Sequence, residues 1–245
     1  MLLVERGLAE SRERAQALIM AGVVFTPSAR VAKAGTLLAS DVEVEVQGRL
    51  PYVSRGGIKL ARALDQFGID PSGLVALDVG ASTGGFTDCL LQRGASRVYA
   101  VDVGHGQLAY TLQKDPRVVS YERVNARFPF DLPEPVDLLV IDVSFISLTL
   151  ALSQPLTHLR SAGGQDGMRT WAGHAVALVK PQFEARRGEV GKNGVIRDDT
   201  LRQDILLRVE HWLSDREDVE LLDTIDSPIT GDAGNREYLA LLRKL

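Results

Sequence analysis

Three short apolar runs constrain the fold of this chain more than any other feature. They occupy residues 75–79, 138–142 and 175–179. A continuous apolar run of this length is typical of a parallel strand covered on both faces, whereas a half-exposed strand alternates apolar and polar residues. Further strands are predicted at residues 96–101 and 238–242, and helices at residues 59–67, 86–93 and 200–213. This succession predicts an α/β domain with a mainly parallel sheet.

Residues 1–48 form a separate predicted unit. Within it, residues 8–19 have the apolar spacing of a helix, with Ser11 as the N-cap. Residues 23–25 and 42–46 have strand-like patterns, and the second alternates strictly. The pattern therefore predicts a small α+β domain at the start of the chain.

A linker and a loop complete the predicted organisation. Residues 49–57 are polar and contain glycine and proline, which indicates a linker, so the larger domain spans residues 58–245. Within that domain, residues 161–174 are polar and rich in glycine, and this composition is typical of a mobile surface loop.

Composition argues against several classes of protein. The formal net charge is −4, which disfavours nucleic-acid binding by bulk charge but leaves a local basic patch open. The single cysteine, Cys89, can form neither an intramolecular disulfide nor a zinc site with other cysteines, and we expect it to pack as a small apolar residue. No apolar run approaches the ~18 residues of a membrane span, and the start of the chain lacks a signal-peptide pattern. We expect a soluble, cytoplasmic protein without a metal site.

A glycine-rich turn follows the first apolar run. Residues 78–86 read DVGASTGGF, and small residues there allow a sharp turn and a close approach of a ligand to the next helix. The spacing differs from G-x-G-x-x-G and no G-K-[ST] follows, which argues against NAD and against a P-loop. Asp102 ends the next strand, where a carboxylate can bind ribose hydroxyls. The turn alone is equally compatible with a structural role, but the combination predicts a bound cofactor.

The pattern D-x-G-x-x-x-G-G-F resembles the cofactor loop of class I S-adenosylmethionine-dependent methyltransferases, and above all the branch that methylates ribose 2′-hydroxyls in RNA. The resemblance implies a Rossmann-like domain in which the glycines hold the methionine part of the cofactor and the acidic residue holds its ribose. The cofactor-binding residues that it implies are Asp78, Gly80, Ser82, Gly84, Gly85, Phe86, Asp102 and Asn125. Asn125 would hold the adenine, and a solvated turn is an equally open interpretation of that residue.

Four polar residues stand where strand ends and the domain joint would bring them together. Asp142 and Lys180 close two apolar runs, Lys59 follows the joint, and Glu237 precedes the last strand. Ligands bind at the carboxyl ends of strands in an open α/β sheet, although each residue alone is also compatible with a solvated charge. Methyl transfer to a hydroxyl requires the loss of its proton, and a lysine can accept that proton only when neutral. Partial burial and a neighbouring lysine both favour the neutral form.

In chain order, these four residues resemble the Lys-Asp-Lys-Glu tetrad of RNA ribose 2′-O-methyltransferases. The resemblance implies that Lys180 is the general base and that Lys59 is its partner. Four further motifs resemble the TlyA family, in which an S4 RNA-binding domain precedes an FtsJ-like domain: VERGLAESR at 4–12, SRGGIKL at 54–60, VKPQFE at 179–184 and SPITG at 227–231. Members of this family methylate the ribose of cytidine in ribosomal RNA and are also named haemolysins.

Basic residues near the start of the chain and around the joint are candidates for RNA contact. They are Arg6, Arg12, Arg14, Arg30, Lys33, Arg55 and Arg62. Nearby glutamates leave solubilising charge as an alternative role. S4 domains usually begin with an Arg-Leu-Asp segment that this chain lacks, so we expect a short first helix. The lack of interleaved aromatic residues favours recognition of RNA shape and phosphate over base stacking.

Three alternatives remain to be weighed against an active RNA methyltransferase. The chain could bind RNA and the cofactor without turnover, although an intact tetrad argues against this. A membrane-active haemolysin would need an amphipathic hairpin or an apolar span, and an S4-linked pseudouridine synthase would have no use for the glycine-rich turn. Ribosomal RNA or a ribosomal subunit is the expected partner, and the short start of the chain favours the large subunit.

Overall fold

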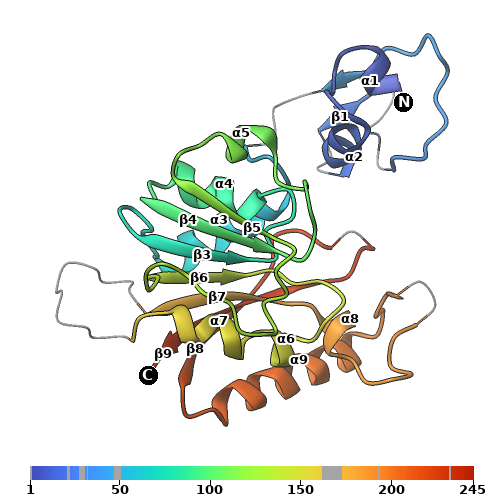
Figure 1. Ribbon diagram of the computed structural model, residues 1–245. Coiled ribbons are helices and arrows are strands. Elements are labelled where there is room, and N and C mark those ends of the chain that lie inside the picture. Colours follow the sequence, from blue (N-terminus) through green and yellow to red (C-terminus); the bar gives the residue numbers. More distant parts are fainter. Residues whose placement is uncertain are drawn as a thin grey trace. The chain divides into compact units, whose positions relative to one another are not determined.

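The computed structural model describes residues 2–20, 23–27, 31, 33–46, 51–161, 173–191, 194–231 and 233–245. Arg30 and most of the predicted loop at 161–174 lie outside these residues. The chain divides into two compact units, Met1–Arg55 and Gly56–Leu245, and the division falls inside the predicted linker at 49–57 (Figure 1).

The first unit contains two helices and a two-stranded antiparallel sheet. The elements are α1 (Leu2–Glu5), α2 (Arg12–Met20), β1 (Val24–Phe25) and β2 (Glu45–Val46). The Ser11 hydroxyl accepts a hydrogen bond from the Arg14 N–H at 3.1 Å, as expected of an N-cap. The predicted helix at 8–19 begins later than expected, because Gly7 has a φ of +68° and starts a turn between α1 and α2.

The second unit is built on a seven-stranded sheet with the order β5-β4-β3-β6-β7-β9-β8. The strands are β3 (Val75–Val79), β4 (Arg97–Asp102), β5 (Val118–Glu122), β6 (Leu138–Ile141), β7 (His174–Val179), β8 (Val219–Asp226) and β9 (Tyr238–Lys244). Five neighbouring strands are parallel, and β9 runs antiparallel to both β7 and β8. The predicted mainly parallel α/β sheet is therefore confirmed.

Helices cover both faces of this sheet (Figure 1). They are α3 (Gly56–Phe67), α4 (Gly85–Gln92), α5 (Tyr110–Gln113), α6 (Leu148–Ala151), α7 (Ser153–His158), α8 (Pro181–Glu184) and α9 (Asp199–Ser214). On one face, α4 packs on β3 and β4, and α3 packs on α4. Elsewhere in this unit, α9 packs against β8 and α8. Cys89 is buried on α4, as expected for a small apolar side chain.

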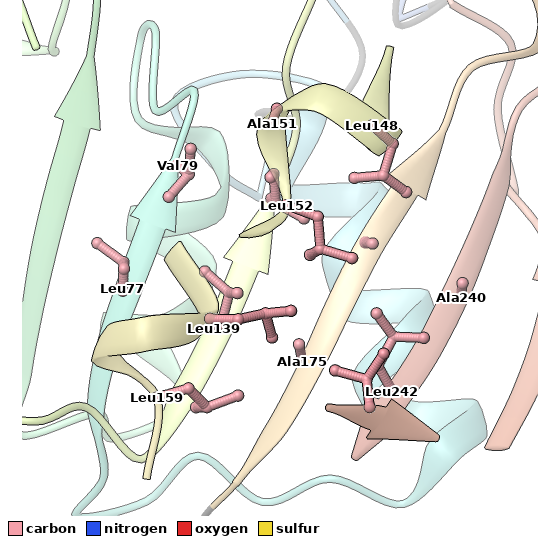
Figure 2. Packing of buried hydrophobic residues seen from close by; sticks show 14 of the residues in the cluster. Leu77, Val79, Leu139, Leu148, Ala151, Leu152, Leu159, Ala175, Ala240 and Leu242 are labelled. Carbon is pink, nitrogen blue, oxygen red and sulfur yellow. The ribbon is translucent and has the colours of Figure 1, made fainter. Parts of the chain in front are cut away.

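Alternate residues of the strands build the larger core (Figure 2). Leu77, Leu139 and Ala175 point to one face, where Leu148 and Leu152 pack against them. Burial of one such leucine contributes about 1.5–3 kcal/mol. The intervening residues of the same strands therefore point to the opposite face, which α3 and α4 cover.

The strand order reverses at β3, because β4 lies on one side of it and β6 on the other. In parallel α/β sheets, the crevice at such a reversal is open at the carboxyl ends of the strands and is where ligands bind. Gly80 follows β3 and Asp142 follows β6 at this position. The glycine-rich turn and the first of the predicted catalytic residues thus start at the same edge.

Candidate active site

The glycine-rich turn passes directly beside the end of β6. Gly80 has a φ of +83°, and a Cβ atom at this residue would lie 2.3 Å from the backbone oxygen of Asp142. Gly84 has a φ of +94°, and a Cβ there would meet Leu112 at 2.3 Å. Only glycine allows both backbone conformations and these close approaches. Gly84 also supplies no side-chain cap to α4, so an anionic group can bind at the first turn of that helix.

Asp102 lines a small pocket, called the hollow below, beside this turn. Its carboxylate accepts hydrogen bonds from the backbone N–H groups of Ser82, at 2.8 Å, and Gly104, at 2.7 Å. The hollow is lined by Ser82 and Asp102 together with Glu122 and other residues of β4, β5 and their loops. Each carboxylate oxygen accepts more than one hydrogen bond, so Asp102 can still accept from a ribose hydroxyl.

Asp78 is completely buried beneath the turn. Its Oδ2 accepts a hydrogen bond from the Thr87 hydroxyl at 2.6 Å, whereas its Oδ1 has no hydrogen-bond partner among the described residues. Burial raises the pKa of Asp78 to about 7, and the nearby charge of Asp142 adds to this effect. A buried carboxylate oxygen without a donor suits an ammonium group or a water held by a ligand. The turn, Asp78 and Asp102 therefore fit S-adenosylmethionine, which carries an amino-acid part and a ribose.

The raised pKa of Asp78 predicts a pH-dependent contribution to stability. In the unfolded chain Asp78 ionises near its ordinary value of 3.8, so between that pH and about 7 the folded chain holds a proton that the unfolded chain has lost. Stability then falls as pH rises through this window. The natural protein should lose free energy of unfolding between pH 5 and pH 8, and Asp78→Asn should not. The stability of Asp78→Asn relative to the natural protein should therefore rise by roughly 2–3 kcal/mol over this range, measured by urea unfolding without cofactor.

An exposed aspartate provides the control for this measurement. Asp215→Asn removes the same charge from the surface of the same unit and should show no such gain. An equal pH dependence in both variants would contradict the assigned environment of Asp78.

Two other predicted cofactor residues have different surroundings. Phe86 is only 3% exposed and packs on the buried face of α4. Asn125 is exposed, and its side-chain oxygen accepts the backbone N–H of Arg127 at 3.1 Å. Neither residue lines the hollow beside Asp102. The local hydrogen bond of Asn125 matches the solvated turn that its sequence also allowed.

Lys180 and Asp142 lie together at the carboxyl edge of the sheet. The Lys180 Nζ is 2.5 Å from Asp142 Oδ1, although this ion pair lacks the angles of a hydrogen bond. The same Nζ donates a hydrogen bond to the Ser144 hydroxyl at 2.8 Å. Lys180 is only 7% exposed, and its ammonium lies 5.8 Å from the centre of the Phe183 ring.

Lys59 and Glu237 form a second, more deeply buried pair. The Lys59 Nζ donates to Glu237 Oε2 at 2.5 Å, and the two side chains are 9% and 2% exposed. Gly231 is needed beside them, because a Cβ there would lie 2.3 Å from Glu237 Oε1. The pair joins α3 to the start of β9 across 178 residues of the sequence.

The sheet register brings the two pairs to one place. Val179 of β7 is paired with Tyr238 of β9, so Lys180 and Glu237 lie opposite each other one step further along. Their chain neighbours Val179 and Tyr238 face the α6 side, and alternation therefore directs Lys180 and Glu237 to the α3 side, where Lys59 lies. Lys59, Asp142, Lys180 and Glu237 thus gather at the carboxyl edge beside Gly80.

Such a cluster can hold a hydroxyl and take its proton. Each lysine is paired with one carboxylate, so the buried charges of the cluster are compensated. Sequence reasoning missed several residues that support the cluster, among them Ser144, Glu184 and Asn235. Asn235 is buried, and its side chain accepts from Ile196 N–H and donates to the Gly194 oxygen.

The predicted RNA-contact residues differ in their surroundings. Arg6 donates to the backbone oxygens of Val42 and Ser40, and Arg14 donates to that of Val53, so both guanidinium groups support the fold of the first unit. Arg12 and Lys33 in the first unit and Arg62 in the second are exposed. Arg55 is partly buried, and Arg30 lies outside the described residues.

Two kinds of feature are absent from the ranges that the structure describes. There, no helix combines the length and the apolarity that crossing a bilayer requires. The same ranges contain no group of three or more His, Cys, Asp or Glu side chains that could hold a metal ion.

Comparison with known proteins points to one family. The family described as FtsJ-like methyltransferase matches residues 52–244. The chain is 43% identical to the 16S/23S rRNA (cytidine-2′-O)-methyltransferase TlyA of Mycobacterium tuberculosis, over 98% of this chain and 87% of that protein. It is 45% identical to Hemolysin A of Brachyspira hyodysenteriae, over 96% and 94%. A solved structure from Streptococcus thermophilus, 40% identical, superposes with a TM-score of 0.75 over 99% of this chain and 86% of that one.

Proposed function

This chain belongs to the FtsJ-like methyltransferase family, and we propose that it transfers a methyl group from S-adenosylmethionine to a ribose 2′-hydroxyl of cytidine in ribosomal RNA. The observation that carries the proposal is the gathering of Lys59, Asp142, Lys180 and Glu237 beside the glycine-rich turn. The name of the mycobacterial relative supports the substrate class. A ribosomal substrate also implies that the protein acts in the cytoplasm.

Lys180 is the proposed general base. S-adenosylmethionine supplies, when bound, a methyl group on a sulfonium centre that a hydroxyl oxygen can attack in line, with cleavage of the S–C bond and a neutral thioether as the leaving group. As the O–C bond forms, the hydroxyl proton passes to the neutral Nζ of Lys180, which then becomes an ammonium. Asp142 lies 2.5 Å from that nitrogen and stabilises the positive charge that develops there. Lys59 and Glu237 complete the cluster and keep its charges balanced.

The chain's own residues divide the work of holding the cofactor. Gly80, Gly84 and Gly85 would hold the methionine part, and Asp102 would accept hydrogen bonds from the ribose. Asp78 would face the amino group directly or through water. Ser82 contributes its backbone N–H to the orientation of Asp102.

The direct test is methyl incorporation into ribosomal particles. Isolated 30S and 50S subunits that lack the modification are incubated with the protein and radiolabelled S-adenosylmethionine, and the labelled nucleotide is mapped. We expect incorporation at a cytidine ribose, with the 50S subunit favoured. Cofactor binding without incorporation into either subunit would instead support an RNA-binding protein that does not turn over.

The first unit is the proposed RNA-binding, S4-like module. Its exposed Arg12 and Lys33 support a role in contacting phosphate groups. A variant that begins at Pro51 should keep its affinity for S-adenosylmethionine and lose most methylation of ribosomal RNA. Calorimetry checks that the remaining domain is folded and binds the cofactor. Methylation at the full rate by this variant would refute the role assigned to residues 1–48.

A further inference from the structure

Two loops meet beside the proposed base. One is the segment 142–148, which follows β6, and the other is the segment 180–184, which is Lys180 with helix α8. They touch at three points along their length: Lys180 contacts Asp142 and Ser144, the ring of Phe183 lies 5.3 Å from that of Phe145, and Glu184 contacts Ser147 and Leu148. The first segment is therefore held against the second over its whole length.

The first segment needs such support because its backbone is strained. Phe145 has a φ of +64°, which costs a residue with a side chain roughly 1–3 kcal/mol. Phe145 is 92% exposed, so burial in the core does not hold it in place. The Glu184 carboxylate accepts the Leu148 N–H at 2.7 Å and the Ser147 hydroxyl at 2.5 Å. These bonds cap the start of α6 and fix the end of the strained segment.

The result is a defined position for the Ser144 hydroxyl. A neutral amine has two N–H groups and one lone pair arranged tetrahedrally. Asp142 Oδ1 and Ser144 Oγ lie 2.5 and 2.8 Å from Lys180 Nζ, so two acceptors surround the nitrogen. The hydrogen bond to Ser144 stops rotation about the Cε–Nζ bond, so the second N–H and the lone pair keep two directions, and the charge of Asp142 attracts the N–H.

We propose that Ser144 is a positioning residue that holds one N–H of Lys180 so that its lone pair faces the substrate hydroxyl, and that Glu184 keeps Ser144 in place. This proposal rests on the proposed function, since it assigns Lys180 the role of the base. Ser144 and Glu184 lie outside the four-residue cluster and add a second layer to it. Ser144 does not itself receive the substrate proton.

Replacement of Ser144 tests the proposal by its kinetic signature. Ser144→Ala should lower the single-turnover rate of methylation about 10- to 100-fold, the size expected for a lost hydrogen bond to the ammonium that Lys180 becomes in the transition state. The KM for ribosomal RNA and the affinity for S-adenosylmethionine should stay within about twofold. Ser144→Thr keeps the hydroxyl at an exposed residue and should restore the rate. Loss of affinity together with rate, or failure of Ser144→Thr to restore it, would overturn the proposal.

A matched serine and the supporting glutamate complete the kinetic test. Ser153→Ala removes a hydroxyl that accepts from Arg216 on the surface, and it should leave the rate unchanged. Glu184→Ala should act through Ser144 and the N–H of Lys180 that Ser144 holds. The double variant Ser144→Ala with Glu184→Ala should therefore methylate only slightly more slowly than either single variant. If the two changes lowered the methylation rate independently, so that their effects on the activation free energy added in full, the role of Glu184 would be wrong.

A measurement without RNA separates this inference from the proposed function. The chain has six lysines, so selective labelling of lysine side-chain carbon gives few NMR signals, and Lys180→Arg assigns that of Lys180. In the full-length, cofactor-free protein, Ser144→Ala should shift the Lys180 signal and Ser144→Thr should leave it near its original place. An unmoved signal in Ser144→Ala overturns the positioning role. A shifted signal in a protein that methylates no ribosomal RNA would show that the substrate assignment has failed instead.

Discussion

Lys180→Ala is expected to lower the single-turnover rate of methyl transfer by about 10²–10⁴-fold, the usual contribution of a positioned base. Its affinity for S-adenosylmethionine should remain nearly unchanged. A base acts in the transition state, so its loss changes the rate of the chemical step more than ground-state binding. Rapid-quench measurements at saturating RNA report the rate, and calorimetry reports the affinity.

Lys180→Arg distinguishes a base from a positive charge. An arginine stays protonated and cannot accept the hydroxyl proton, so we expect no recovery of rate. Lys114→Ala is the matched control, because this lysine lies near an exposed tyrosine on α5 and its loss should leave methylation intact. Near-normal single-turnover methylation by Lys180→Arg would contradict the assignment, and Asp142, Glu237 or a bound water would then have to act as base.

The sheet could be predicted from the sequence because its central strands are buried on both faces. Residues 75–79 and 175–179 are continuous apolar runs, and a parallel strand covered by helices is the structure that such runs favour. The gathering of Asp142 and Lys180 could also be anticipated, since parallel strands deliver their carboxyl ends to one edge. Strand β8 was missed because it is a half-exposed edge strand with a bulge between Leu221 and Asp223, which breaks its alternation.

The supporting contacts of the site could not be predicted from sequence. Ser144 meets Lys180, and Leu148 meets Glu184, across 36 residues in each case. No local pattern of spacing encodes these contacts, because they depend on two loops adopting one conformation after the strands have paired. The positive φ of Phe145 is likewise a consequence of tertiary contacts, since sequence preference alone disfavours it for an aromatic residue.

The pair of Lys59 and Glu237 should have the largest effect on stability. Glu237→Gln keeps the shape of the side chain but leaves the ammonium of Lys59 buried without a counter-charge, which costs about 3–5 kcal/mol. The double change Lys59→Met with Glu237→Leu removes both charges and should recover most of this loss, while methylation stays absent because the cluster is broken. Urea unfolding gives the stabilities, and methyl incorporation gives the activity.

An exposed ion pair that includes Arg236, the neighbour of Glu237 in the chain, makes the comparison quantitative. Arg236 and Asp226 lie 3.3 Å apart with side chains 51% and 59% exposed, so Asp226→Asn should cost no more than about 1 kcal/mol. If Glu237→Gln lowered the free energy of unfolding as little as Asp226→Asn, the large stabilising contribution assigned to the buried pair would be wrong. Methylation by the double variant at the natural rate would show that Lys59 and Glu237 stabilise the joint between α3 and β9 but take no part in the reaction. The two readouts therefore separate a structural ion pair from a catalytic one.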